Sequence, residues 1–210
     1  MMPSLSRRLE LLQFWRFECQ CPRCQDVTEM GTLASGVMCD RCDGGVMLPD
    51  TCHVYSNWSC NTCDVCHDHE FIHNLINQCQ SKISSINSST TAAQVELLLT
   101  ELQTKLHKNH SICLNLQRLL ISLYGSKPDE EQFLTRQNEL CHQFIGTMSI
   151  LEPGYRSWLG PVVKELILNI TRQVNRDITN NNIDKMEYVK KLMEIMNWSK
   201  KEAKCREIFT

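Results

Sequence analysis

The chain has 210 residues, of which 22% are charged, and a formal net charge of −2 at pH 7. This balance provides no basic surface for nucleic acid, and no apolar run approaches the ~20 residues of a membrane span. We therefore expect no direct nucleic-acid partner, no membrane partner and a monomeric chain. The length allows one large domain or two small ones.

The thirteen cysteines are unevenly distributed, because nine of them lie between Cys19 and Cys66. No signal-peptide pattern opens the chain, so tight C-x-x-C pairs indicate metal binding in a reducing compartment rather than disulfides. Zinc takes four thiolate or imidazole ligands, and two C-x-x-C turns can supply them. We therefore expect a zinc-binding region over residues 1–67. Its candidate ligands are Cys19, Cys21, Cys24, Cys39, Cys42, Cys60 and Cys63.

Spacing alone allows two pairings of the C-x-x-C turns. The middle pair, Cys39/Cys42, could join the preceding pair across fourteen residues or Cys60/Cys63 across seventeen. We favour the second pairing, because the glycines of "CDRCDGG" let backbone amides turn toward sulfur and "WSCNTC" offers a strand-like approach. This choice predicts one zinc ribbon and leaves Cys19, Cys21 and Cys24 as a three-ligand set. Any of the spare residues near the ribbon could also be a ligand, although an extra Cys or His there is more often structural. They are Cys52, His53, Cys66, His67 and His69.

Helical periodicity replaces the cysteine pairs from Asp68 onward. A capping box at Thr91 and Gln94 opens one of the predicted helices, and Pro128 opens another. Residues 112–123, nearly continuous in leucine and isoleucine, predict the most buried helix. The apolar stripes run over residues 72–86, 95–106, 112–123, 133–148, 162–178 and 186–196, and a short last helix follows Ser199. We expect a mainly α fold, in which a small Cys-rich module precedes a tetratricopeptide-like antiparallel helical array over residues 68–210.

The stretch "SRRLELLQFWRFECQCPRCQDVTEMGTLASGVMCDRCDGG" resembles the post-SET region of the SET-and-MYND (SMYD) family of protein-lysine methyltransferases. The matching elements are the two arginines, the aromatic-x-aromatic before the cysteines, the C-x-C-x-x-C and "DVTEMGT". The second C-x-x-C with "NWSCNTC" resembles the divergent branch of the family, in which a zinc ribbon follows. "LHKNHSICLNLQRLLISLYG" and "LEPGYRSWLG" resemble its C-terminal helical domain, so the resemblance covers nearly the whole chain.

The resemblance implies roles for three features. The post-SET zinc loop closes one wall of the channel in which a lysine receives a methyl group from S-adenosylmethionine, and its fourth ligand is a cysteine of the SET core. By position, Phe17 matches the cofactor-binding aromatic that stacks on the adenine. Trp15 matches an aromatic of the substrate channel, where tyrosine or phenylalanine is usual. The alternative is that Trp15 and Phe17 simply bury the zinc knuckle against the first helix.

The SET motifs for S-adenosylmethionine and the catalytic tyrosine have no counterpart in this sequence. We therefore expect no catalytic residue in this chain, which resembles the C-terminal part of such an enzyme and would be a truncated gene model or an isoform. The implied cofactors are zinc and, only with a full SET domain, S-adenosylmethionine. The implied partner is a lysine-containing protein substrate such as a histone, in the cytoplasm or nucleus. The competing hypotheses are a non-catalytic zinc-binding and helical interaction module, and a redox or metal-buffering role.

Overall fold

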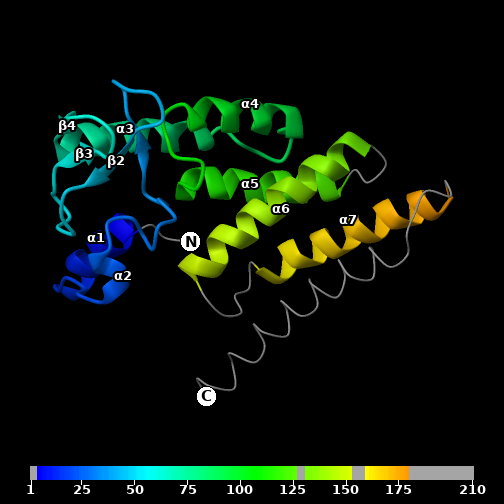
Figure 1. Ribbon diagram of the computed structural model, residues 1–210, viewed down its shortest axis with the longest axis horizontal. Helices are drawn as coiled ribbons and strands as arrows, with labels where there is room; N and C mark the ends of the chain where they lie inside the picture. Colours follow the sequence, from blue (N-terminus) through cyan, green and yellow to red (C-terminus); the bar gives the residue numbers. More distant parts are fainter. Residues whose placement is uncertain (1–3, 127–130, 153–158, 180–210) are drawn as a thin grey trace, which may run out of the picture. The chain divides into compact units, whose positions relative to one another are not determined.

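The computed structural model describes residues 4–126, 131–152 and 159–179 (Figure 1). They form seven helices and one four-stranded sheet, so the predicted mainly α class with a Cys-rich module is confirmed. Two compact units divide the chain, Met1–Leu116 and Gln117–Thr210. None of the helices in the described ranges is long and apolar enough to cross a membrane.

The first unit opens with two helices and continues with short antiparallel strands in the order β1-β2-β3-β4 (Figure 1). Its elements are α1 (Ser4–Trp15), α2 (Pro22–Gln25), β1 (Val37–Met38), β2 (Val46–Pro49), β3 (Trp58–Cys60), β4 (Cys66–His67), α3 (His69–Ile83), α4 (Ala92–Gln103) and the start of α5 (Ser111–Gly125). In the register of the sheet, Met47 pairs with Cys60 and Ser59 with Cys66. Met47 and Trp58 are almost fully buried, so the ribbon has its own small core.

The loop between α4 and α5 covers the outer edge of β1. The backbone N–H of Met38 donates to the carbonyl of Lys105 at 2.9 Å, and that of His107 donates to the carbonyl of Gly36 at 3.0 Å. An added Cβ at Gly36 would lie 2.7 Å from Cγ1 of Val46 on β2, so the close contact between residue 36 and this strand requires glycine. The compact unit thus extends beyond residue 67, where strands give way to helices. The division at 67 stays a prediction.

The first helices begin where their capping residues stand. Oδ1 of Asp68 accepts from the N–H of Phe71 at 2.7 Å, which starts α3 at His69. At the start of α4 both hydrogen bonds of the predicted capping box are present, between Thr91 and Gln94. The apolar stripes of these two helices and of α5 are buried or half-buried, as periodicity predicts. Their buried residues include Ile72, Cys79, Val95, Leu99, Leu102, Ile112, Cys113, Leu114, Leu116, Leu120 and Ile121.

The second unit contains the end of α5, α6 (Glu131–Leu151) and α7 (Leu159–Thr179). The last two are antiparallel, because residues further along α6 contact residues nearer the start of α7. Asn169 donates to the carbonyl of Leu134 at 2.8 Å and to Oε1 of Gln137 at 2.9 Å, while Cys141 lies near the carbonyl of Val162. The predicted start at 128, the predicted helices after 180, and the side chains of the 162–178 stripe beyond 173 lie outside the described residues. The tetratricopeptide-like arrangement stays a prediction.

Candidate metal centres

The structure brings four thiols together at the ribbon: Cys39, Cys42, Cys60 and Cys63, whose sulfur atoms all lie within 4.8 Å of one another. The Sγ atoms of Cys39 and Cys63 are 3.7 Å apart, as are those of Cys42 and Cys60. A disulfide would need about 2.05 Å. A tetrahedron with Zn–S bonds of about 2.3 Å has S···S edges of about 3.8 Å. The four sulfurs are therefore spaced as zinc requires, in the pairing that we favoured from the sequence.

Backbone geometry around the four thiols explains this convergence. The N–H of Arg41 donates to Sγ of Cys39 and the N–H of Thr62 to Sγ of Cys60, each at 3.4 Å, which favours the thiolate form. Gly45 has another role than the one expected from the sequence. An added Cβ there would lie 2.5 Å from Sγ of Cys42 and 2.6 Å from Sγ of Cys60. Gly45 therefore provides room for two sulfurs, whereas the amides that donate to sulfur here are those of Arg41 and Thr62.

Without metal, the thiols of the ribbon differ in their pKa. Desolvation raises the pKa of Cys60, but hydrogen bonds from the backbone N–H groups of Cys63 and Thr62 outweigh it and lower the pKa to about 6. A hydrogen bond with Cys63, followed by desolvation, raises the pKa of Cys42 to about 12. One thiolate therefore forms readily at neutral pH, and a bound cation would have to displace the remaining protons.

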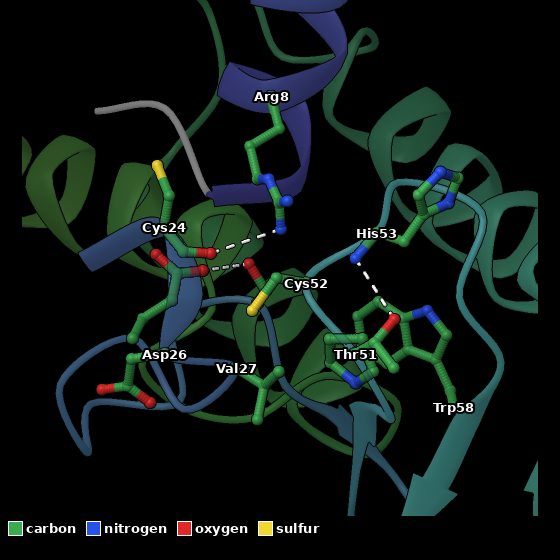
Figure 2. A pocket seen from close by; sticks show the side chains of 11 residues that line it. Arg8, Cys24, Asp26, Val27, Thr51, Cys52, His53 and Trp58 are labelled. Carbon is green, nitrogen blue, oxygen red and sulfur yellow. Dashed lines mark hydrogen bonds between the residues drawn. The ribbon is translucent and has the colours of Figure 1, made fainter. Parts of the chain in front are cut away.

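A second set of three thiols, Cys19, Cys21 and Cys24, lies around the first turn of α2. Cys24 is buried, and its Sγ accepts from Nη2 of Arg7 at 3.2 Å, while Nη1 of Arg8 donates to its backbone carbonyl at 3.3 Å (Figure 2). Desolvation raises the pKa of Cys24 despite the arginine beside it. Within the described ranges no fourth Cys, His, Asp or Glu joins this set. It could hold zinc through three thiolates with one coordination position left over.

Three aromatic side chains beside this set are exposed: Phe14 by 73%, Trp15 by 72% and Phe17 by 49%. The helix α1 ends at Trp15, and Arg16 takes a left-handed φ of 56°, which is a common way for a helix to end. Trp15 is therefore too exposed to bury the zinc knuckle, whereas Phe17 is about half-buried, and a packing role for it stays a prediction. An exposed apolar cluster of this kind is typical of a surface that another part covers.

The loop after α2 packs against the ribbon around a small cavity of about 30 Å³ (Figure 2). Arg8, Asp26, Cys52, His53 and Trp58 are among its lining residues. This cavity has room for about one or two water molecules and is far too small for a nucleoside cofactor. Sγ of Cys52 donates to the carbonyl of Gln25 at 2.6 Å, so this thiol is engaged outside the three-thiol set.

The other spare residues of the ribbon also lie outside the thiol sets. Nε2 of His67 lies 3.1 Å from Oδ1 of Asp40, and Nε2 of His53 lies 3.6 Å from Oε1 of Glu18. Cys66 is exposed. His69, however, has a partner that the sequence reasoning missed, His73, one helical turn further along α3. The signal was available as the H-E-x-x-H pattern in "HEFIH".

Comparison with known proteins agrees with the sequence resemblance. No family model matches the chain. Over 99 residues it is 34% identical to isoform B, and 33% identical to isoform A, of the SET domain-containing protein SmydA-8 of Drosophila melanogaster. The alignments cover 40% of this chain but only 22% and 21% of the relatives, so the match spans about a fifth of their length. Over that part of its length, the chain is SMYD-like.

Proposed function

We propose that this chain supplies the post-SET zinc lid and a substrate-selecting helical domain to a SMYD-like, S-adenosylmethionine-dependent protein-lysine methyltransferase. On its own it is incomplete for catalysis. Bound S-adenosylmethionine would supply the methyl group that a neutral lysine amine accepts. The residues of this chain would cover the cofactor and orient the lysine, and the rest of the chemistry would belong to the SET core.

The observation that carries this proposal is a three-thiol set beside exposed aromatics. Zinc in proteins is almost always four-coordinate, so Cys19, Cys21 and Cys24 call for one more ligand. A thiolate from a SET core packed on this face would complete the set. The same packing would cover Trp15 and Phe17, which are otherwise costly to leave in water.

Each aromatic then has a distinct task. Phe17 would stack on the adenine, and Trp15 would line the lysine channel, where its π-face favours a cationic amine before deprotonation. The ribbon zinc, held by the four other thiols, would fix the lid from behind. The substrate is a lysine-containing protein, with histones among the candidates.

Metal stoichiometry tests the proposal. The purified chain should hold one zinc tightly, at the ribbon, and a second weakly. Adding the SET domain of SmydA-8 as a separate polypeptide should tighten the second zinc and create a site for S-adenosylmethionine, measured by calorimetry. Cys21→Ser should abolish this gain, whereas Cys66→Ser, a matched exposed cysteine outside both sets, should leave it unchanged.

Two results would contradict the proposal. Two tight zincs in the isolated chain would mean that the three-thiol set has its fourth ligand within the chain. Micromolar binding of S-adenosylmethionine by the chain alone would mean that no SET core is needed. A chain that holds both zincs and ignores the SET domain would instead behave as an interaction module.

A further inference from the structure

A pair of histidines on α3 lies outside both thiol sets. His69 and His73 are four residues apart, and positions i and i+4 share one face of a helix. Because Asp68 caps the helix just before His69, both residues are within regular helix. This is the spacing at which two imidazoles of an H-E-x-x-H segment can reach one metal ion.

The two rings lie close together and stack, so the exposed ring of His73 must turn about its side-chain torsions before the in-plane lone pairs of both rings can meet at one ion. Their centroids are 5.6 Å apart and their planes are inclined by only 15°. Tyr55 packs edge-on against His69 with a centroid distance of 5.3 Å, which holds that ring from one side. His73 is exposed, so the space beside the pair opens to solvent and to ions.

One ligand atom of the pair is unused. Nε2 of His69 is shielded from solvent, and it has no hydrogen-bond partner among the described residues. Such atoms are rare, because most buried polar atoms find a partner. The other ring also has a polar neighbour, since the amide nitrogen of Asn77, Nδ2, lies 3.2 Å from Nδ1 of His73. With that amide nitrogen as donor, Nδ1 accepts and the ring proton lies on Nε2. Turning the Asn77 amide by 180° instead lets its oxygen accept from Nδ1–H and leaves the lone pair of His73 on Nε2, as in most metal-bound histidines.

Two nearby carboxylates offset the effect of the helix N-terminus on the histidine pair. The first turn of a helix carries partial positive charge, which disfavours a cation. The carboxylates of Asp68 and Glu70 offset this, and both act to raise the pKa of His69. Desolvation and His73 outweigh them, so the pKa of His69 falls below its usual value. The imidazole is therefore neutral at pH 7, the form that binds metal.

We propose that His69 and His73 bind a borderline transition-metal ion, such as Zn²⁺ or Ni²⁺, through one nitrogen of each ring. Within the described ranges, no third Cys, His, Asp or Glu forms a ligand group with them. Water or a ligand from another molecule would fill the remaining positions. A zinc protease has three protein ligands in addition to its motif glutamate, so this pair is a binding site without hydrolytic activity.

The test uses the full chain carrying Cys21→Ser, which removes the weak three-thiol set, with the ribbon loaded with zinc and Ni²⁺ alone as the probe. Calorimetric titration should show one Ni²⁺ site. His69→Gln and His73→Gln should each weaken it by at least about tenfold. Asn77→Leu should also weaken binding, by about tenfold, whereas Asn77→Asp, which keeps an acceptor for Nδ1–H, should preserve it. His142→Gln, an exposed histidine on α6, is the matched control and should change nothing.

Two further measurements keep the result unambiguous. Released zinc and thiolate-to-nickel absorption are recorded during the titration, because Ni²⁺ entering a thiol set would produce both. Helical circular dichroism checks that α3 stays folded in each variant. Ni²⁺ affinity that is unchanged in His73→Gln would overturn the proposal, and so would binding that occurs only with zinc release.

Discussion

Replacing Gly45 with alanine should disrupt the ribbon metal centre. The new Cβ would lie 2.5 Å from Sγ of Cys42, 2.6 Å from Sγ of Cys60 and 3.2 Å from Cβ of Cys39. Comfortable contacts between carbon atoms are about 3.5–4.0 Å, so each sulfur must retreat by roughly 1 Å. Thiolates that must also stay about 2.3 Å from one zinc cannot both retreat without distorting the tetrahedron.

The magnitude follows from what the metal contributes. Structural zinc sites bind with about 10–16 kcal/mol, and even changes outside the ligands cost 10–100-fold in metal affinity. Since two of the four ligands move, we expect a loss at the upper end, about 100-fold, which corresponds to about 2.7 kcal/mol. Competition for zinc with a chromophoric chelator measures this directly.

The adjacent glycine provides the matched control. Gly44 has a φ of +74°, but a Cβ there would meet no atom within 4 Å. Gly44→Ala should therefore cost only left-handed backbone strain, about 1–2 kcal/mol, and leave the sulfur positions intact. The reasoning is refuted if Gly45→Ala binds zinc as tightly as the unaltered chain, or if both variants lose the same affinity.

Three further predictions concern stability. Burial and then the nearby His107 lower the pKa of His110 to about 4, so folding keeps this imidazole neutral. Its contribution is fully present above the unfolded pKa of about 6.5 and is lost as pH falls toward 4, by about 3 kcal/mol in total. Urea unfolding from pH 7 to 4.5 should show this loss, and His110→Gln should flatten it. Leu102→Ala, at a fully buried position of α4, should cost about 2–5 kcal/mol by the same assay. Leu97→Ala, 73% exposed on the same helix, should cost less than about 0.5 kcal/mol, and equal losses would contradict the burial pattern. Thr91→Ala removes the capping box and should lower the free energy of unfolding by about 1 kcal/mol, which a lower melting temperature would report. An unchanged melting temperature would show that the cap is dispensable.

Local patterns predicted the features that depend on neighbours in sequence. The capping box at Thr91 is visible because its partner is three residues away, and the stripe of α5 because buried helical residues recur at a fixed spacing. The resemblance of the post-SET stretch was likewise visible, since it depends on a short run around Cys19. The histidine pair is also visible in the sequence, because "HEFIH" sets two histidines four residues apart.

The covered edge of β1 could not be predicted from its sequence. Met38 and Lys105 are far apart in the chain, and their hydrogen bond depends on how the α4–α5 loop returns to the ribbon. For the same reason, the change in periodicity near residue 67 does not show how far the compact unit that contains β1, Met1–Leu116, extends.

The sequence alone determined which residues can act as zinc ligands, because thiolates in C-x-x-C turns are brought together by one tight turn. It also determined the helical character of the described residues from Asp68 to Thr179, because periodicity is a local property. Only the tertiary structure decided which pairs meet, since spacing allowed Cys39/Cys42 two partners and the strand register joins them to Cys60/Cys63. It also decided that Trp15 is mostly exposed and Phe17 about half-exposed. An apolar ring in a sequence can be core or surface, and only the path of the chain around it settles which.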